Sequence, residues 1–227
     1  MTGIKCYADF VGALLEAGFA MGGKNSEGVF SLTPFYEASA IKWHTENPET
    51  DPWEWRMRVL NERNDISYGK IFFKKSGYLT RAWAPYFIAA RRGNAELAED
   101  YENGIISNAA RRIYNVVLEN ETLPLHAIKQ LAGFSREDKS RFDRALVELQ
   151  MKMYLSMCGS QQKTSSQGEE YGWSSTVFCT TEHFWGEEVF EKAKALNKNE
   201  AFNALTKQIM LLNPAADSKN ISRFILG

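Results

Sequence analysis

The feature of this sequence that most constrains its fold is a change of apolar spacing within residues 101–179. Pro124 opens a short helix that Gly133 ends, and Ser135 caps a further helix because Asp138 follows at the spacing of a capping box. Ahead of both, apolar residues recur every three or four positions, as on one buried helix face. These residues are Ile106, Ala110, Ile113, Tyr114, Val117 and Leu118.

Two predicted strands follow these three helices. They cover residues 153–157 and 173–179, and the polar segment 159–170 between them is predicted as a loop. This order of elements is that of a winged helix-turn-helix: a helix, a short helix, a third helix and then a two-stranded ribbon. We therefore expect an α+β fold, mostly helical, with winged helix-turn-helix modules and short β-hairpins, and we expect the polar loop at the tip of the wing.

The rest of the chain predicts shorter elements. Asp51 is placed to cap a helix that Pro52 opens, because its carboxylate can accept hydrogen bonds from first-turn amides and proline fixes φ. Helices are predicted over 7–17, 53–61, 81–91, 187–196 and 199–212, and strands over 29–32 and on both sides of a Lys-Lys-Ser-Gly turn within 69–80.

The composition is that of an ordinary globular protein. The chain has 227 residues and a net charge of -1, which argues against a protein that coats DNA through its overall charge but allows a local basic face. Its cysteines are Cys6, Cys158 and Cys179, without a Cys-x-x-Cys pair, so we expect free thiols and a cytoplasmic location. No apolar stretch near the N-terminus reaches the roughly 20 residues that cross a bilayer, so we expect no membrane partner.

Positive charge gathers in one part of this nearly neutral chain. Residues 53–92 contain nine Lys or Arg and only three Asp or Glu. Cations interleaved with aromatic rings are typical of surfaces that bind anions or nucleic acid, although the rings can equally belong to the core. The contacts predicted in this region are Trp43, His44, Trp53, Trp55, Arg56, Lys70, Lys74 and Lys75.

A second candidate surface lies on the helix predicted after Ser135. Arg136, Arg141 and Arg144 would face a nucleic acid there. Because acids are interleaved with them, the same helix can instead be a packing element with a solvated mixed-charge face.

Candidate catalytic residues are limited to the acids Glu49, Asp51 and Glu54. Neighbouring carboxylates can raise one pKa toward neutrality and serve as general acid or base. The alternative is a turn followed by a helix N-terminus, where acids cap amides and favour the helix dipole. The sequence has no zinc-binding, P-loop, nucleophile-elbow or dinucleotide motif, so we expect no metal and no cofactor.

Four runs of sequence carry a family resemblance: WHTENPETDPWEWR, YGKIFFKKSGYLTRAW, LAGFSREDKSRFDRALVELQMKMYL and YGWSSTVFCTTEHFWGEEVF. They resemble the AlkZ-related family, bacterial proteins distantly related to the AlkZ crosslink-repair DNA glycosylases, and the resemblance covers nearly the whole chain. It implies a winged-helix-like unit with the basic-aromatic segment in residues 1–95. It also implies a winged helix with C-terminal helices in residues 96–227, the two packed as one body or as separate units.

The resemblance does not carry over a catalytic motif. The glycosylases depend on Gln-x-Gln or Gln-x-Asp shortly after the first helix, whereas residues 18–22 here read Gly-Phe-Ala-Met-Gly and the first glutamine is Gln130. We therefore predict a cytoplasmic winged-helix protein that binds DNA. The alternatives are a diverged hydrolase or glycosylase that uses an acid of residues 49–54, and a non-catalytic scaffold for protein interactions. The sequence does not predict the oligomeric state.

Overall fold

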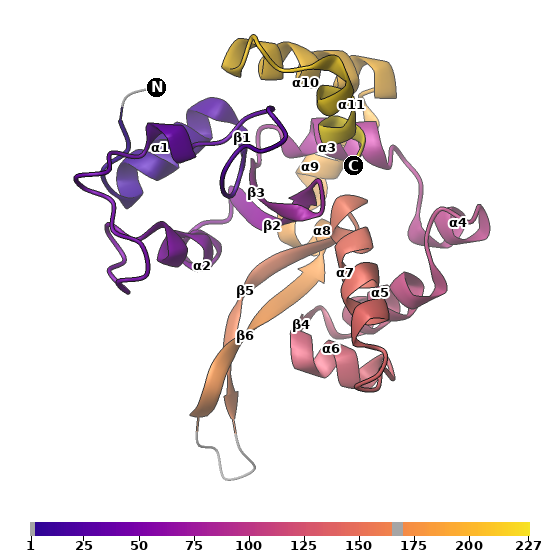
Figure 1. Cartoon of the computed structure of the whole chain (residues 1–227). Coiled ribbons are helices and arrows are strands. Elements are labelled where there is room, and N and C mark those ends of the chain that lie inside the picture. The colour runs from indigo at the N-terminus through magenta and orange to yellow at the C-terminus, as the bar shows by residue number, and fades with distance from the viewer. Residues whose placement is uncertain (1–2, 165–169) are drawn as a thin grey trace.

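The computed structural model describes residues 3–164 and 170–227 and shows an α+β protein (Figure 1). Its first part contains a three-stranded antiparallel sheet in the order β1-β3-β2. The elements of this part are α1 (Tyr7–Ala17), β1 (Phe19–Met21), the 3-10 helix η1 (Thr33–Phe35), α2 (Pro52–Glu62), β2 (Ile66–Phe72), β3 (Lys75–Thr80) and α3 (Ala84–Arg91).

Helix α1 confirms the prediction for residues 7–17, and Gly18 ends it with a φ of 88°. A side chain at Gly18 would collide with the ring of Trp83, so the chain can turn directly into β1 only because this residue is glycine. The strand predicted over 29–32 is wrong. Only Ser31 forms an isolated bridge there, with Met21 of β1.

The turn between β2 and β3 lies at Phe73 and Lys74, whose φ angles are 51° and 61°. Positive φ at both central residues suits the right-handed twist of a two-residue hairpin. The two predicted strands are confirmed, but the turn comes earlier than the predicted Lys-Lys-Ser-Gly. Gly77 belongs to β3, where the ring of Phe72 occupies the place that a Cβ would need.

The second part contains another three-stranded antiparallel sheet, in the order β4-β6-β5. Three predicted helices and two predicted strands are confirmed, and β4 and α4 were not predicted. The elements are α4 (Leu97–Glu102), α5 (Asn108–Asn120), β4 (Thr122–Pro124), α6 (Leu125–Leu131), α7 (Lys139–Met151), β5 (Leu155–Thr164) and β6 (Glu170–Thr180).

Two boundaries in this part differ from the prediction. Helix α7 begins at Lys139, because the Asp138 carboxylate accepts hydrogen bonds from the amide and hydroxyl of Ser135 and residues 135–138 form a turn. The polar segment predicted as a loop continues the two strands to Thr164 and from Glu170, while residues 165–169 lie outside the described residues. The resulting ribbon projects from the body (Figure 1).

The C-terminal part is helical: α8 (Thr181–Trp185), α9 (Glu187–Lys194), α10 (Lys198–Leu212) and α11 (Ser218–Leu226). Helices α9 and α10 confirm the prediction, and α8 and α11 were not predicted. These helices pack on the first part of the chain, since Phe224 of α11 stacks on Phe72 of β2 with ring centroids 3.9 Å apart. The division into units 1–95 and 96–227 stays a prediction. The core that α9–α11 share with the first sheet is separate from the core of α5–α7.

Two buried polar side chains join these cores. The Arg91 guanidinium donates hydrogen bonds to the carbonyl oxygens of Ile71, Met151, Phe224 and Ile225. Burial lowers the pKa of Arg91 to about 9. The Gln150 side chain on α7 accepts a hydrogen bond from the Lys70 amide on β2. Strand β2 is therefore linked by hydrogen bonds to α7 directly and, through Arg91, to the end of α7 and to α11.

Candidate nucleic-acid interface

The loop before α2 is organised by Asp51. Its carboxylate is fully buried and accepts hydrogen bonds from the amides of Trp53 at 2.8 Å, Thr45 at 2.7 Å and Glu46 at 3.2 Å. Burial by itself raises the pKa of Asp51, but these hydrogen bonds outweigh burial and lower the pKa below its ordinary value. The predicted cap is confirmed, and Asp51 is an ionised structural group.

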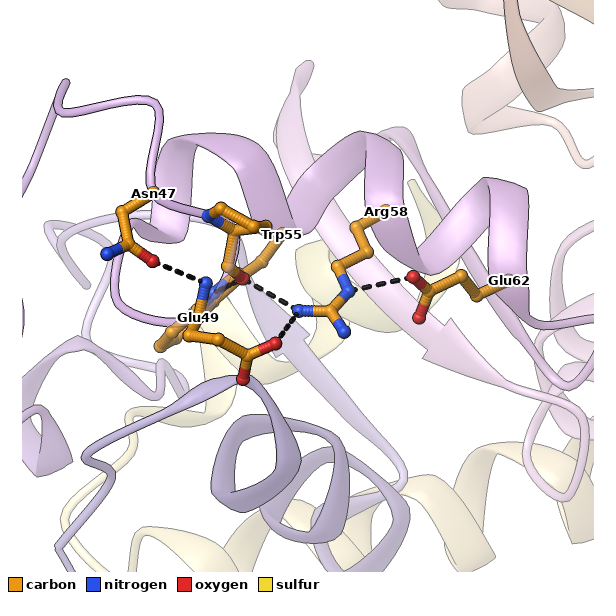
Figure 2. Close-up of polar contacts among 6 residues, drawn as sticks. Asn47, Glu49, Trp55, Arg58 and Glu62 are labelled. Atoms are coloured by element: carbon orange, nitrogen blue, oxygen red, sulfur yellow. Dashed lines mark hydrogen bonds and ion pairs between the residues drawn. The ribbon is translucent and has the colours of Figure 1, made fainter.

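The other two candidate acids, Glu49 and Glu54, do not share the hydrogen bonds of Asp51. Arg58 donates to Glu49 at 2.7 Å and to Glu62 at 2.8 Å, and it also reaches the Pro48 carbonyl oxygen (Figure 2). Glu54 is half-buried and forms no ion pair within residues 3–164 and 170–227. Glu49 and Asp51 thus each have a structural role, and no two of the three candidate acids are joined by a hydrogen bond.

The three tryptophans of this segment have different environments. Trp55 is fully buried, packs on Phe10 and donates its indole N–H to the Pro48 carbonyl oxygen at 3.0 Å. This corrects its assignment as a nucleic-acid contact, because its ring has no exposed face. Trp43 and Trp53 are 46% and 45% exposed, with the His44 ring 5.1 Å from Trp53.

Trp53 forms part of a groove that we call the α2 groove. It consists of two adjoining pockets of about 330 and 400 Å³ that share Trp53, Arg56, Tyr68 and Ser76. The groove lies between the N-terminus of α2, the β2–β3 hairpin and the β5–β6 ribbon. Its cations are Lys24, Arg56, Lys70 and Lys75, and among the described residues no Asp or Glu lines it.

Most of these cations lack a carboxylate partner. Lys75 forms an ion pair with Glu27 and donates to the Ser26 hydroxyl at 2.9 Å. Arg56 places its guanidinium 3.4 Å from the centre of the Trp53 ring and donates its Nε–H to the Trp53 carbonyl oxygen. In the described part of the chain, Arg56, Lys70 and Lys24 form no ion pair. Their positive charge is therefore available to an anion.

The remaining predicted cations lie elsewhere. Lys74 is the second residue of the turn between β2 and β3, and its amide donates to the Met151 sulfur at the end of α7. It lines a pocket of about 850 Å³ that we call the α7 pocket, together with Arg144. Arg136 precedes α7 and Arg141 lies in its first turn, and both are exposed. The α7 pocket is also lined by Lys139 and Lys152, and by the acids Glu137, Asp143 and Glu148.

The sequence interpretation missed the part of the groove that comes from distant segments. Lys24 follows a glycine pair, and the ribbon supplies Ser160, Ser174 and Thr176. These hydroxyls lie about a hundred residues beyond α2 in the chain, so no local pattern joins them to Trp53. The run of Ser and Thr in β6 is the one signal that could have been noticed.

Two further findings concern the described residues only. None of their helices is long and apolar enough to cross a membrane. Among them, no three His, Cys, Asp or Glu side chains come together in a way that could hold a metal ion.

The comparisons with known proteins give one match. The model of the family described as AlkZ related matches residues 4–226, so the chain belongs to this family. No curated protein and no solved structure matches the chain.

Proposed function

We propose that this AlkZ-related protein binds DNA through the α2 groove. The observation that carries the proposal is the set of four lining cations without a lining carboxylate. Exposed Trp43 and Trp53 add aromatic surface beside these charges. Cations that follow a backbone and rings that stack bases are the usual components of a nucleic-acid groove. The relation of the family to DNA glycosylases supports DNA as the partner.

We also infer that residues 108–180 form a winged helix. The order α5, β4, α6, α7, β5, β6, with β6 between β4 and β5, supports this assignment. Helix α7 then takes the place of the recognition helix. The acids of α7 would repel a phosphate backbone. We therefore assign the main DNA contact to the α2 groove and the ribbon beside it. The free thiols of Cys6, Cys158 and Cys179 suit a cytoplasmic location.

The hydrolase alternative has weaker support. A general base needs a carboxylate that can take a proton near neutral pH. Hydrogen bonds hold the pKa of Asp51 low, and Glu49 is an ion-pair partner of Arg58. We therefore propose DNA binding without assigning a catalytic residue.

The test is a titration of fluorescent DNA followed by anisotropy at several salt concentrations. Three unpaired cations predict a slope of about −3 in log affinity against log salt, because each phosphate contact releases about 0.9 counterion. The variant Arg56→Gln/Lys70→Gln should make this slope shallower by about 2. Lys139→Gln/Arg144→Gln is the matched control and should leave it unchanged. Absence of salt-dependent binding by the wild type would overturn the proposal.

A further inference from the structure

The two pockets of the α2 groove differ in their chemistry. The smaller one, which we call the aromatic pocket, places Trp43, Pro52 and Met21 beside the shared Trp53 and Tyr68. The larger one, the hydroxyl pocket, places Ser160, Ser174 and Thr176 of the ribbon opposite Lys70. The aromatic pocket thus offers flat rings, with Lys24 and Lys75 also in its lining, and the hydroxyl pocket offers hydroxyl groups together with Lys70.

Arg56 stands on the wall between the two pockets. Its guanidinium carbon lies 3.4 Å from the centre of the Trp53 ring, and its Nε–H donates to the Trp53 carbonyl oxygen at 2.6 Å. A guanidinium has five N–H donors, so its terminal nitrogens remain available. Within the described residues they meet no carboxylate. The same residue therefore fixes the ring and presents donors to the neighbouring pocket.

A nucleotide has the same division into a flat ring and a charged phosphate. We infer that the α2 groove binds one unpaired nucleotide of a DNA strand, with its base in the aromatic pocket and its phosphate beside Arg56 and Lys70. This inference rests on the proposed function and makes it more specific. In a continuous duplex both faces of a base are stacked on neighbouring bases, so Trp43 or Trp53 can contact a base face only when the base is unstacked.

The experiment uses the full chain and oligonucleotides that carry 2-aminopurine, a base whose fluorescence falls when it stacks. The probe is placed in a single strand, in a one-nucleotide bulge of a duplex and in a perfect duplex. We expect the bulge and the single strand to bind about tenfold more tightly than the perfect duplex, with quenching of the probe. Stacking of one base on an aromatic side chain accounts for a difference of this size.

Two variants test the rings separately. Trp43→Ala and Trp53→Leu should each weaken binding of the bulged DNA by about 5- to 10-fold, toward the affinity of the perfect duplex. Their affinity for the perfect duplex should stay within about twofold of wild type. Leu211→Ala removes another exposed apolar side chain, 76% exposed on α10, and is the matched control. Thermal unfolding of each variant checks that the fold is retained, and Trp43→Ala leaves the Arg56–Trp53 contact in place.

The outcomes separate the inference from the proposed function. Equal affinity for bulged and perfect duplex without quenching overturns the inference and leaves DNA binding in place. Failure to bind any of the three DNAs overturns both. A free deoxynucleoside monophosphate that competes at the affinity of the bulged DNA would show that the ligand is a free nucleotide, which also overturns the inference.

Discussion

The α2 groove and the α7 pocket are lined by the same number of cations and differ in their acids. Four Lys or Arg line each of them, but three carboxylates line the α7 pocket and none of the described residues lining the α2 groove is an acid. The number of cations alone would make the two regions equally good candidates for binding an anion. What distinguishes them is whether acids stand among the cations of the lining.

The difference arises from how each region is built. The acids of the α7 pocket and three of its four cations lie on α7 or next to one of its ends, where alternating signs give a solvated face. The α2 groove takes its cations from four segments: the loop after β1, α2, β2 and β3. Tertiary folding brings them together without bringing their sequence neighbours, so the acids nearby in sequence do not line the groove.

The largest expected effect comes from reversing charge in the groove. Arg56→Glu/Lys70→Glu should weaken DNA binding by about 100-fold at low salt, because two phosphate contacts become repulsive. Lys139→Glu/Arg144→Glu makes the same change of charge in the α7 pocket and should alter affinity by less than about threefold. Anisotropy titrations with one duplex measure both. Equal losses would show that overall charge, and not the groove, governs binding.

The next effect concerns the loop that carries Trp43 and the start of α2. Asp51→Asn should lower the free energy of unfolding by about 1–3 kcal/mol, because an amide cannot accept from all the backbone N–H groups that the buried carboxylate satisfies. Urea unfolding measures this change. Glu46→Gln removes the same charge from an exposed position of the same loop, and its effect should stay within about 0.5 kcal/mol.

The pH dependence of this stabilisation has a definite sign. The pKa of Asp51 in the folded protein lies below its ordinary value of 3.8. Its stabilisation is therefore fully present above that value and is lost as the pH falls through the folded pKa. The difference in the free energy of unfolding between wild type and Asp51→Asn should shrink as the pH falls below about 4. A difference that stays constant down to pH 2 would contradict the role given to the ionised carboxylate.

Local signals in the sequence predicted much of the fold. The cap at Asp51, the Gly18 end of α1 and the spacing of α5 are each contained within a few neighbouring residues. Strands β1 and β4 were not predicted because each is three residues long and depends on pairing with β3 or β6. The packing of α11 on β2 has no local signal either.

The candidate site was also predictable only where its signals lie close together in the sequence. The segment that contains Trp43, Trp53 and Arg56 was identified from charge and aromatic content. Trp55 was misassigned because positions two apart on a helix face different directions, so the outward Trp53 implies an inward Trp55. The separation of Lys74 from Lys75 depends on the positive φ of the turn, which composition does not reveal.

A smaller effect is expected from the single acid that neutralises a groove cation. Glu27→Gln removes the ion-pair partner of Lys75 and should raise DNA affinity by about two- to fourfold at low salt. Glu37→Gln is the control, because Glu37 pairs with Lys5 outside the groove. The same anisotropy assay measures both. Unchanged affinity for Glu27→Gln would mean that Lys75 does not contact DNA.

The smallest effect is expected where the acids of the α7 pocket are neutralised. Glu137→Gln/Asp143→Asn gives this pocket an excess of cations that resembles the α2 groove. We expect less than a twofold gain in affinity, because no tryptophan that could stack a base is among the described residues that line this pocket. A gain larger than that of Glu27→Gln would show that carboxylates alone keep α7 from binding DNA. Helix α7 would then have to be regarded as a second DNA-binding surface, with its affinity limited by Glu137 and Asp143.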